Sequence, residues 1–208
     1  MNQKMKKYYI VEDYIEGDSL RDWLNKGNTF KLKKAVEVLD TLLSLEIELE
    51  KNGILHRDIN PNNIILATTG IVYLIDFGLA RRLDQKSLTN TSATFGPFTP
   101  GYAPYEQFAN IKQAQDVRTD LFQIGVTIYE GCTGKNPNIE RNDDLFQILT
   151  RTISFVPQLL NISGDTEGLF AQFINVLMSK KQTQRPDTAL DAMKYLIAIK
   201  DTLDLEEV

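Results

Sequence analysis

The feature that most limits the possible folds of this chain is a short predicted β-hairpin with polar, potentially catalytic segments at both ends. β-branched and other apolar residues fill positions 64–66 and 71–75, and Thr68-Thr69-Gly70 separates the two runs. Such a pattern is typical of two antiparallel strands joined by a tight turn. The segment His56-Arg57-Asp58-Ile59-Asn60-Pro61-Asn62-Asn63 precedes the hairpin, and Asp76-Phe77-Gly78 follows it. The hairpin is therefore flanked by side chains that can do chemistry.

Most of the remaining chain predicts helices. Apolar residues recur at steps of three and four over positions 32–49, which indicates a long amphipathic helix ended by Asn52-Gly53. The run 121–129 is apolar almost all round and favours a helix buried on most sides, although its length alone also permits a buried strand. Two further amphipathic helices are expected near 169–178 and 188–199. The expected fold class is mainly α with a small β-hairpin.

Two other segments have distinct patterns. Positions 8–11 read Tyr-Tyr-Ile-Val, which predicts one short strand with no partner nearby in the sequence. Its unpaired edge would need a cover. Positions 81–100 are rich in Ser, Thr, Asn, Gly and Pro without a helical or strand period, which predicts a long surface loop.

Composition narrows the class of protein. The chain has 208 residues, 42% hydrophobic and 25% charged, with a net charge of −5. These values are typical of a globular protein and argue against general nucleic-acid binding. Cys132 is the single cysteine, so no internal disulfide forms. Neither a signal-peptide core nor a membrane-spanning stretch is visible in the sequence, which favours a cytoplasmic protein without a membrane partner.

The two polar segments resemble those of a protein kinase of the eukaryotic-like Ser/Thr type. The resemblance continues through Thr99-Pro100-Gly101-Tyr102-Ala103-Pro104-Tyr105-Glu106-Gln107, through the range Asp120 to Gly125, and through Arg185-Pro186. It runs from position 8 to about position 200 and implies the helical C-terminal lobe of the kinase fold. We therefore expect residues 1–208 to be a truncated kinase-like domain that comprises the hinge and this lobe.

The resemblance implies a set of catalytic and metal-binding residues. Asp58 matches the catalytic aspartate, and Thr99 matches the threonine that braces it. Asn63 and Asp76 match the Mg²⁺ ligands, since phosphoryl transfer needs oxygen ligands that hold Mg²⁺ against ATP. Asn60 occupies the position where Ser/Thr kinases usually place a lysine near the transferred phosphate, and losing such a partner typically costs about 10²–10³ in rate.

The resemblance also implies an ATP site around positions 13–17. The backbone of Asp13 and Ile15 would meet the adenine edge, Ser19 would lie near the ribose, and Ile65 would form the floor under the base. Glu12 falls at the gatekeeper position. These are expected contacts of the cofactor ATP.

Other matched residues have expected structural roles. His56 should pack beneath Phe77, and Asp120 should brace the catalytic loop. Glu106 and Arg185 match a buried salt bridge. Arg57 suits a phosphate in the loop after Gly78, with Ser92 and Thr94 as the nearest candidates, although a solvated, unphosphorylated loop fits equally.

The glycine-rich loop and the phosphate-contacting lysine that precede the hinge in kinases find no match in this sequence. We therefore expect the N-terminal lobe to be absent from the chain and activity to be incomplete without it. The expected partners are a protein substrate, a protein that supplies the lobe, or a second copy paired through the strand at 8–11. A pseudokinase or protein-interaction module without catalysis is the alternative, and a truncated reading frame of a complete kinase is a third possibility.

Overall fold

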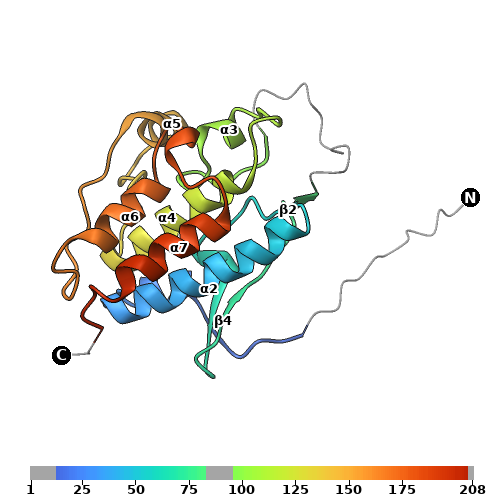
Figure 1. The fold of residues 1–208 in the computed structure, drawn as a ribbon. Helices are drawn as coiled ribbons and strands as arrows, with labels where there is room; N and C mark the ends of the chain where they lie inside the picture. The colour runs from blue at the N-terminus through green and yellow to red at the C-terminus, as the bar shows by residue number, and fades with distance from the viewer. Residues whose placement is uncertain (1–12, 83–95, 206–208) are drawn as a thin grey trace, which may run out of the picture.

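The computed structural model describes residues 13–82 and 96–205, and helices dominate these ranges (Figure 1). The expected mainly helical fold with a small sheet is confirmed. The main body consists of α2 (Leu32–Lys51), α4 (Val117–Thr133), α6 (Leu169–Leu177) and α7 (Ala189–Lys200). Shorter elements are α1 (Leu20–Asn25), α3 (Tyr105–Phe108), α5 (Leu145–Ser154) and the 3₁₀ turns η1 (Pro61–Asn63) and η2 (Gln182–Gln184).

The predicted long helix is α2. Its buried face is formed by the apolar residues at the expected spacing, together with one acidic residue, Glu46. The helix ends at Asn52, whose backbone N–H bonds back to the last turn, and Gly53 follows with a φ of 63°. This left-handed conformation suits glycine at a helix end. α2 packs against both α4 and α7 along its length (Figure 1).

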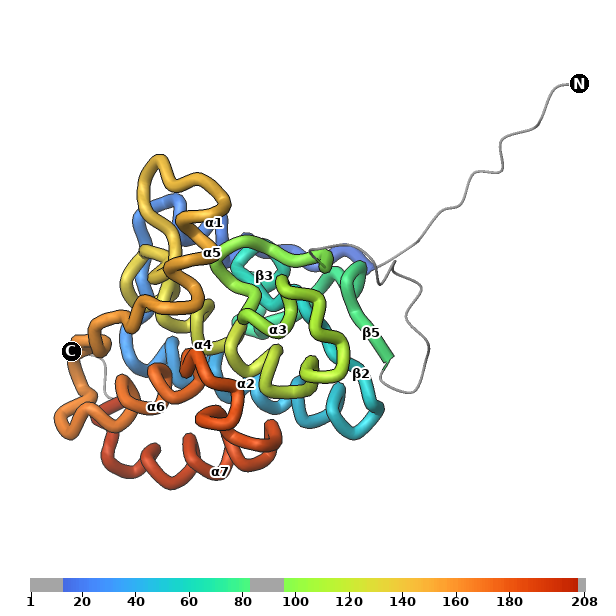
Figure 2. The backbone as a smooth tube through the Cα atoms, turned by 90° about the horizontal axis from the view of Figure 1, so that it is seen from above, coloured from blue at the N-terminus to red at the C-terminus, as the bar shows by residue number. Residues whose placement is uncertain are grey.

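The predicted buried helix is α4, the centre of the helical body. Asp116 caps its start by accepting a hydrogen bond from the Arg118 backbone, and Gly134 ends it with a φ of 71°. α4 contacts α2, α6 and α7, and lies between α7 and the strands when viewed from above (Figure 2). A Cβ on Gly125 would come within 2.8 Å of the Leu177 Cβ on α6, so this close approach of two helices requires glycine.

The sheet confirms the predicted hairpin and adds a third strand. β3 (Ile64–Ala67) pairs antiparallel with β4 (Val72–Leu74), and Ile64 lies opposite Leu74. β1 (Gly17–Ser19) pairs antiparallel with the other edge of β3. A second, two-stranded sheet joins β2 (Ile54–Leu55) to β5 (Arg81–Arg82). The β2–β3 connection therefore carries the first polar segment, and the β4–β5 connection carries the second.

Some expectations differ from the structure or fall outside it. The predicted strand at 8–11 lies outside the described residues, as do Glu12, Ser92 and Thr94. The predicted loop 81–100 begins with β5, because Arg81 and Arg82 pair with β2. α5 was not expected from apolar periodicity, yet Asp144 and Gln147 form a reciprocal capping box at its start. In the described ranges, no helix has the length and apolar character needed to cross a membrane.

Candidate active site

Segment 56–63, the predicted catalytic loop and called the catalytic loop below, connects β2 to β3 and is held by its own side chains. Asn60 caps the η1 turn, where its Oδ1 accepts a hydrogen bond of 3.0 Å from the Asn62 backbone N–H. The Asn60 Nδ2 donates to the Asp58 carbonyl at 3.0 Å, and the Asn63 Nδ2 donates to the same carbonyl at 2.8 Å. These bonds fold the loop tightly around Asp58.

Asp58 has both carboxylate oxygens fixed. Thr99 Oγ1 donates to Oδ1 at 2.5 Å, and Asn63 Nδ2 donates to Oδ2 at 2.9 Å. Asp58 nevertheless stays partly exposed, whereas its neighbours Arg57 and Ile59 are buried. The structure thus brings three of the residues singled out in the sequence, Asp58, Asn63 and Thr99, into direct contact. Because ionised carboxylates accept strong hydrogen bonds, the arrangement fixes the orientation of Asp58.

Asp120 braces the loop from α4, as expected. Its Oδ2 accepts from the His56 backbone N–H at 2.8 Å, and its Oδ1 accepts from the Arg57 backbone N–H at 2.7 Å. Arg57 has a φ of 68°, a conformation that costs of order 1–3 kcal/mol for a non-glycine residue and persists only where neighbours enforce it. Asp120 is fully buried, and burial raises the pKa of its carboxyl to about 6.

Two glutamines that lie in the matched segments, but to which the sequence assigned no role, complete this brace. Gln123 Oε1 accepts from the Ile59 backbone N–H at 2.8 Å, and its Nε2 donates to the Arg57 carbonyl at 3.0 Å. Gln107 Nε2 donates to the same carbonyl at 2.7 Å. Gln123 follows Asp120 by three residues on α4, so helical spacing places both side chains on one face. That spacing is the signal that could have identified Gln123.

His56 has the expected packing role. Its ring centroid lies 4.7 Å from that of Phe77, and its Nε2 lies 3.3 Å from the Ile75 carbonyl oxygen. Burial lowers the pKa of this imidazole, which favours the neutral form. His56 therefore links the catalytic loop to the Asp76-Phe77-Gly78 segment by packing.

Asp76 follows β4 beside the catalytic loop. The Ile75 backbone N–H donates to the Asn63 carbonyl at 2.8 Å, which sets Asp76 one residue from this contact. Asp76 has a φ of 62°, and its Oδ1 accepts from the Gly78 backbone N–H at 2.9 Å. Within the described residues, no hydrogen bond occupies the Asn63 Oδ1 or the Asp76 Oδ2.

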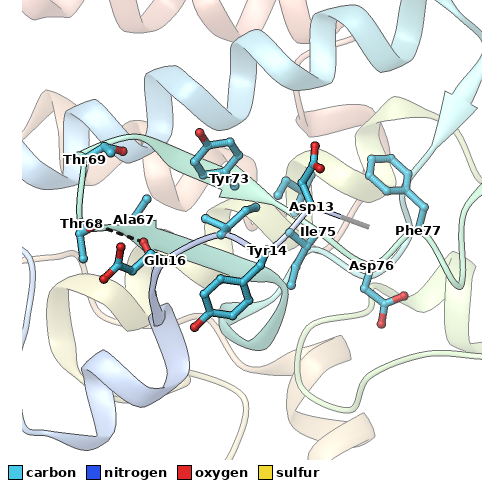
Figure 3. A pocket seen from close by; sticks show the side chains of 12 residues that line it. Asp13, Tyr14, Glu16, Ala67, Thr68, Thr69, Tyr73, Ile75, Asp76 and Phe77 are labelled. Carbon is cyan, nitrogen blue, oxygen red and sulfur yellow. Dashed lines mark hydrogen bonds between the residues drawn. The ribbon is translucent and has the colours of Figure 1, made fainter. Parts of the chain in front are cut away.

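A cavity of about 600 Å³ lies between the 13–16 segment and the β3–β4 hairpin (Figure 3). Asp13, Ile15 and Asp76 line it, together with Tyr14, Glu16 and Phe77. Glu16 is tied to the hairpin because its carbonyl accepts a hydrogen bond of 3.0 Å from the Thr68 backbone N–H. The side chains of Asp76 and Phe77 point in different directions at the far end of the cavity (Figure 3).

Ser19 and Ile65 lie beside this cavity but do not line it. They face each other across the β1–β3 pair, and Ile65 also pairs with Tyr73, which does line the cavity. Ser19 Oγ caps α1 by accepting from the Asp22 backbone N–H at 3.0 Å. The predicted ribose contact of Ser19 and base contact of Ile65 stay predictions.

The expected salt bridge between Glu106 and Arg185 is confirmed. Arg185 Nη1 donates to Glu106 Oε1 at 2.6 Å, and both side chains are almost fully buried. The Arg185 guanidinium also lies 4.8 Å from the ring centroid of Phe122 on α4. This pair anchors the segment that carries Thr99 and α3 to the end of the helical body.

Comparison with known proteins agrees with this geometry. The family model described as "Protein kinase domain" matches residues 1–196. The chain is 26% identical over 196 residues to "Probable serine/threonine-protein kinase PknB" of Lactococcus lactis subsp. lactis (strain IL1403), covering 94% of this chain and 30% of that protein. It is 36% identical over 132 residues to "Serine/threonine-protein kinase PknB" of Mycobacterium tuberculosis (strain ATCC 25618 / H37Rv), covering 62% of this chain and 20% of that protein.

The family match and these relatives place the chain in a definite class. It belongs to the protein kinase family, and its similarity is to serine/threonine-protein kinases. The chain spans less than a third of the length of these curated relatives.

Proposed function

We propose that this chain carries the catalytic loop and the magnesium-binding face of an ATP-dependent serine/threonine protein kinase. The observation that carries the proposal is the double restraint of a partly exposed Asp58, by Thr99 on one carboxylate oxygen and Asn63 on the other. A fixed carboxylate orients an acceptor hydroxyl and accepts its proton. Thr99 and Asn63 keep Asp58 in that orientation.

Asn63 and Asp76 offer oxygen atoms that fit a magnesium ion. Mg²⁺ prefers oxygen ligands and is usually bound through one or two carboxylates, water and substrate phosphates. Asn63 Oδ1 and Asp76 Oδ2, which carry no hydrogen bond within the described residues, are oxygen ligands of this type. The backbone hydrogen bond from Ile75 to Asn63 joins the two segments that carry them. Within the described residues, no cluster of three His, Cys, Asp or Glu side chains offers a different metal site. When bound, Mg²⁺ neutralises phosphate charge on ATP.

ATP would occupy the cavity next to these residues. Asp13, Ile15 and Asp76 line this cavity. The backbone of Asp13 and Ile15 would meet the adenine edge, and Asp76 would face the phosphates. Tyr14 is 91% exposed and Phe77 is 50% exposed beside this cavity. We propose that a further protein segment, corresponding to the N-terminal lobe of kinases, covers these aromatic side chains in the active form. Such a lobe would also supply the lysine that contacts the ATP phosphates in kinases.

The pseudokinase alternative is favoured by one observation. Asn60 stands where the family usually has a lysine, is 2% exposed, and uses its amide to cap η1. Its side chain is therefore committed to the loop rather than to a phosphate. In this alternative the chain would bind a protein or a nucleotide without transferring phosphate.

A phosphotransfer assay separates the two candidates. The purified chain, alone and with a candidate N-terminal lobe, would be incubated with γ-labelled Mg-ATP and serine- or threonine-containing peptides. We expect label on hydroxyl groups, reduced by about 10²–10⁴ in Asp58→Asn, while Glu48→Gln, at an exposed acid on α2 away from the cavity, leaves the rate unchanged. No transfer under any of these conditions, despite binding of Mg-ATP, would favour the pseudokinase.

A further inference from the structure

Glu46 is a buried acid that forms no ion pair with a positively charged residue in ranges 13–82 and 96–205. It lies on the apolar face of α2 and is 0% exposed. In the described parts of the chain, neither of its carboxyl oxygens accepts a hydrogen bond. Among the ion pairs of these parts, none includes Glu46. Because an ionised carboxylate without a partner is very costly to bury, this arrangement favours the neutral acid.

The groups that face Glu46 are also acidic. Asp120 faces it from α4, and Glu50 lies one turn further along α2. Glu50 is already engaged, since its Oε2 accepts from the Ala189 backbone N–H at the start of α7 at 3.0 Å. Asp120 receives two backbone N–H groups of the catalytic loop, and the Arg57 guanidinium favours its charged form. Of Glu46 and Asp120, the residue with the better stabilised negative charge is therefore Asp120.

We infer that Glu46 keeps its proton and donates it as a hydrogen bond to the Asp120 carboxylate, so that an acid pair, rather than Asp120 alone, braces the catalytic loop. This inference deepens the proposed function and rests on it for its catalytic consequence. Two neighbouring carboxyl groups in a buried site share one proton because both cannot ionise together. A carboxylate has about four acceptor positions, so Asp120 accepts the third donor without losing its two amide bonds.

The pair makes Glu46 a positioning residue. It would act on the backbone of His56 and Arg57 through Asp120, and it is not among the residues that line the cavity. Burial and the Asp120 charge raise the pKa of Glu46 well above its ordinary value. Loss of the Glu46 proton would put two like charges beside the loop and weaken the hold of Asp120 on the two amides. The hydrogen bonds from the His56 and Arg57 amides to Asp120 are therefore expected to weaken as the pH rises through the raised pKa of Glu46.

Carbon NMR of the full chain labelled with [5-¹³C]glutamate tests the protonation directly. The Glu46 resonance would be assigned by its absence in Glu46→Gln. We expect it at the position of a protonated acid at pH 7, moving only at higher pH. A Glu46 resonance at the carboxylate position at pH 7, with a midpoint near the ordinary value of 4.5, would overturn the inference.

The pH dependence of unfolding provides a second readout. The folded chain keeps the Glu46 proton and the unfolded chain releases it, so stability falls as pH rises. Above the ordinary value of 4.5 and below the raised pKa of folded Glu46, the folding equilibrium constant should fall by up to about tenfold per pH unit relative to Glu46→Gln. Glu48→Gln on the exposed face of α2 is the matched control and should follow the wild-type slope. Equal slopes for wild type and Glu46→Gln would contradict the acid pair.

The positioning role is tested by a variant that removes the donor. Glu46→Leu should shift the His56 and Arg57 amide resonances and lower kcat with little change in KM for ATP, whereas Glu46→Gln, which keeps an N–H donor, should preserve both. Unchanged amide resonances and kcat in Glu46→Leu would show that Glu46 does not position the loop. If the wild-type chain transfers no phosphate at all, the proposed function fails, while the two proton readouts still decide the acid pair.

Discussion

Thr99 donates a hydrogen bond of 2.5 Å to the Asp58 carboxylate across a sequence separation of 41 residues. Thr99 belongs to the segment that precedes α3, whereas Asp58 belongs to the loop between β2 and β3. The orientation of the catalytic-type aspartate therefore depends on the position of a separate segment. The buried Glu106–Arg185 pair holds that segment in place. Displacement of this segment would release one carboxylate oxygen of Asp58.

Thr99→Ala tests this dependence. A hydrogen bond to a charged group contributes about 1.5–3 kcal/mol, so we expect kcat for phosphotransfer to fall by roughly 10- to 100-fold. KM for ATP should change little, because Thr99 is not among the residues that line the cavity. Thr99→Ser keeps the hydroxyl and should retain most of the rate. Equal rates for Thr99→Ala and the wild type in steady-state assays would show that Thr99 does not orient Asp58 for catalysis.

The Glu106–Arg185 pair is expected to be a stability determinant. Glu106→Gln leaves the Arg185 guanidinium buried without its counter-charge, and such a loss costs about 3–5 kcal/mol in free energy of unfolding. Urea denaturation of both proteins measures this difference. The double variant Glu106→Gln/Arg185→Met removes the stranded charge and should recover part of the loss. A single variant as stable as the wild type would contradict the buried-charge explanation.

The sequence predicted the elements whose pattern is local. The 3.6-residue period of α2 and the apolar run of α4 depend only on neighbouring residues, and so does the β3–β4 hairpin around Gly70. Asp58, Asn63, Asp76 and Thr99 were identified through their motifs, and the structure brings Asp58, Asn63 and Thr99 into contact.

The contacts that sequence reasoning missed join distant segments. Gln107 and Gln123 meet the catalytic loop from 50 and 66 residues away, and no local period reports such contacts. Glu46 was missed for a different reason. A charged residue in an amphipathic helix is normally exposed, yet the packing of α4 against α2 buries this one. Tertiary packing therefore determines whether these polar side chains are buried and which groups they contact.

Lys180 should make the free energy of unfolding rise with pH in the alkaline range, which is opposite to the effect expected for Glu46. Burial, with a smaller effect of the Arg185 charge, lowers the pKa of Lys180 from 10.5 to about 8. Between these values the unfolded chain binds a proton that the folded chain has released, so stability rises with pH. The free energy of unfolding of the wild type relative to Lys180→Met should therefore rise from about pH 8 to pH 10.5. A pH-independent difference in denaturation experiments would show that Lys180 stays charged in the folded chain.

Binding of Mg-ATP tests the central claim most directly, because every proposed catalytic role requires the nucleotide at the cavity lined by Asp13, Ile15 and Asp76. Calorimetric titration with ATP would be run with and without Mg²⁺, on the wild type, on Asp76→Asn and on Glu48→Gln, a control at an exposed acid on α2. The proposed function predicts magnesium-dependent binding that is lost in Asp76→Asn and kept in Glu48→Gln. Binding of the wild type that is independent of both Mg²⁺ and Asp76, or no binding at millimolar ATP even with a candidate N-terminal lobe, would contradict it.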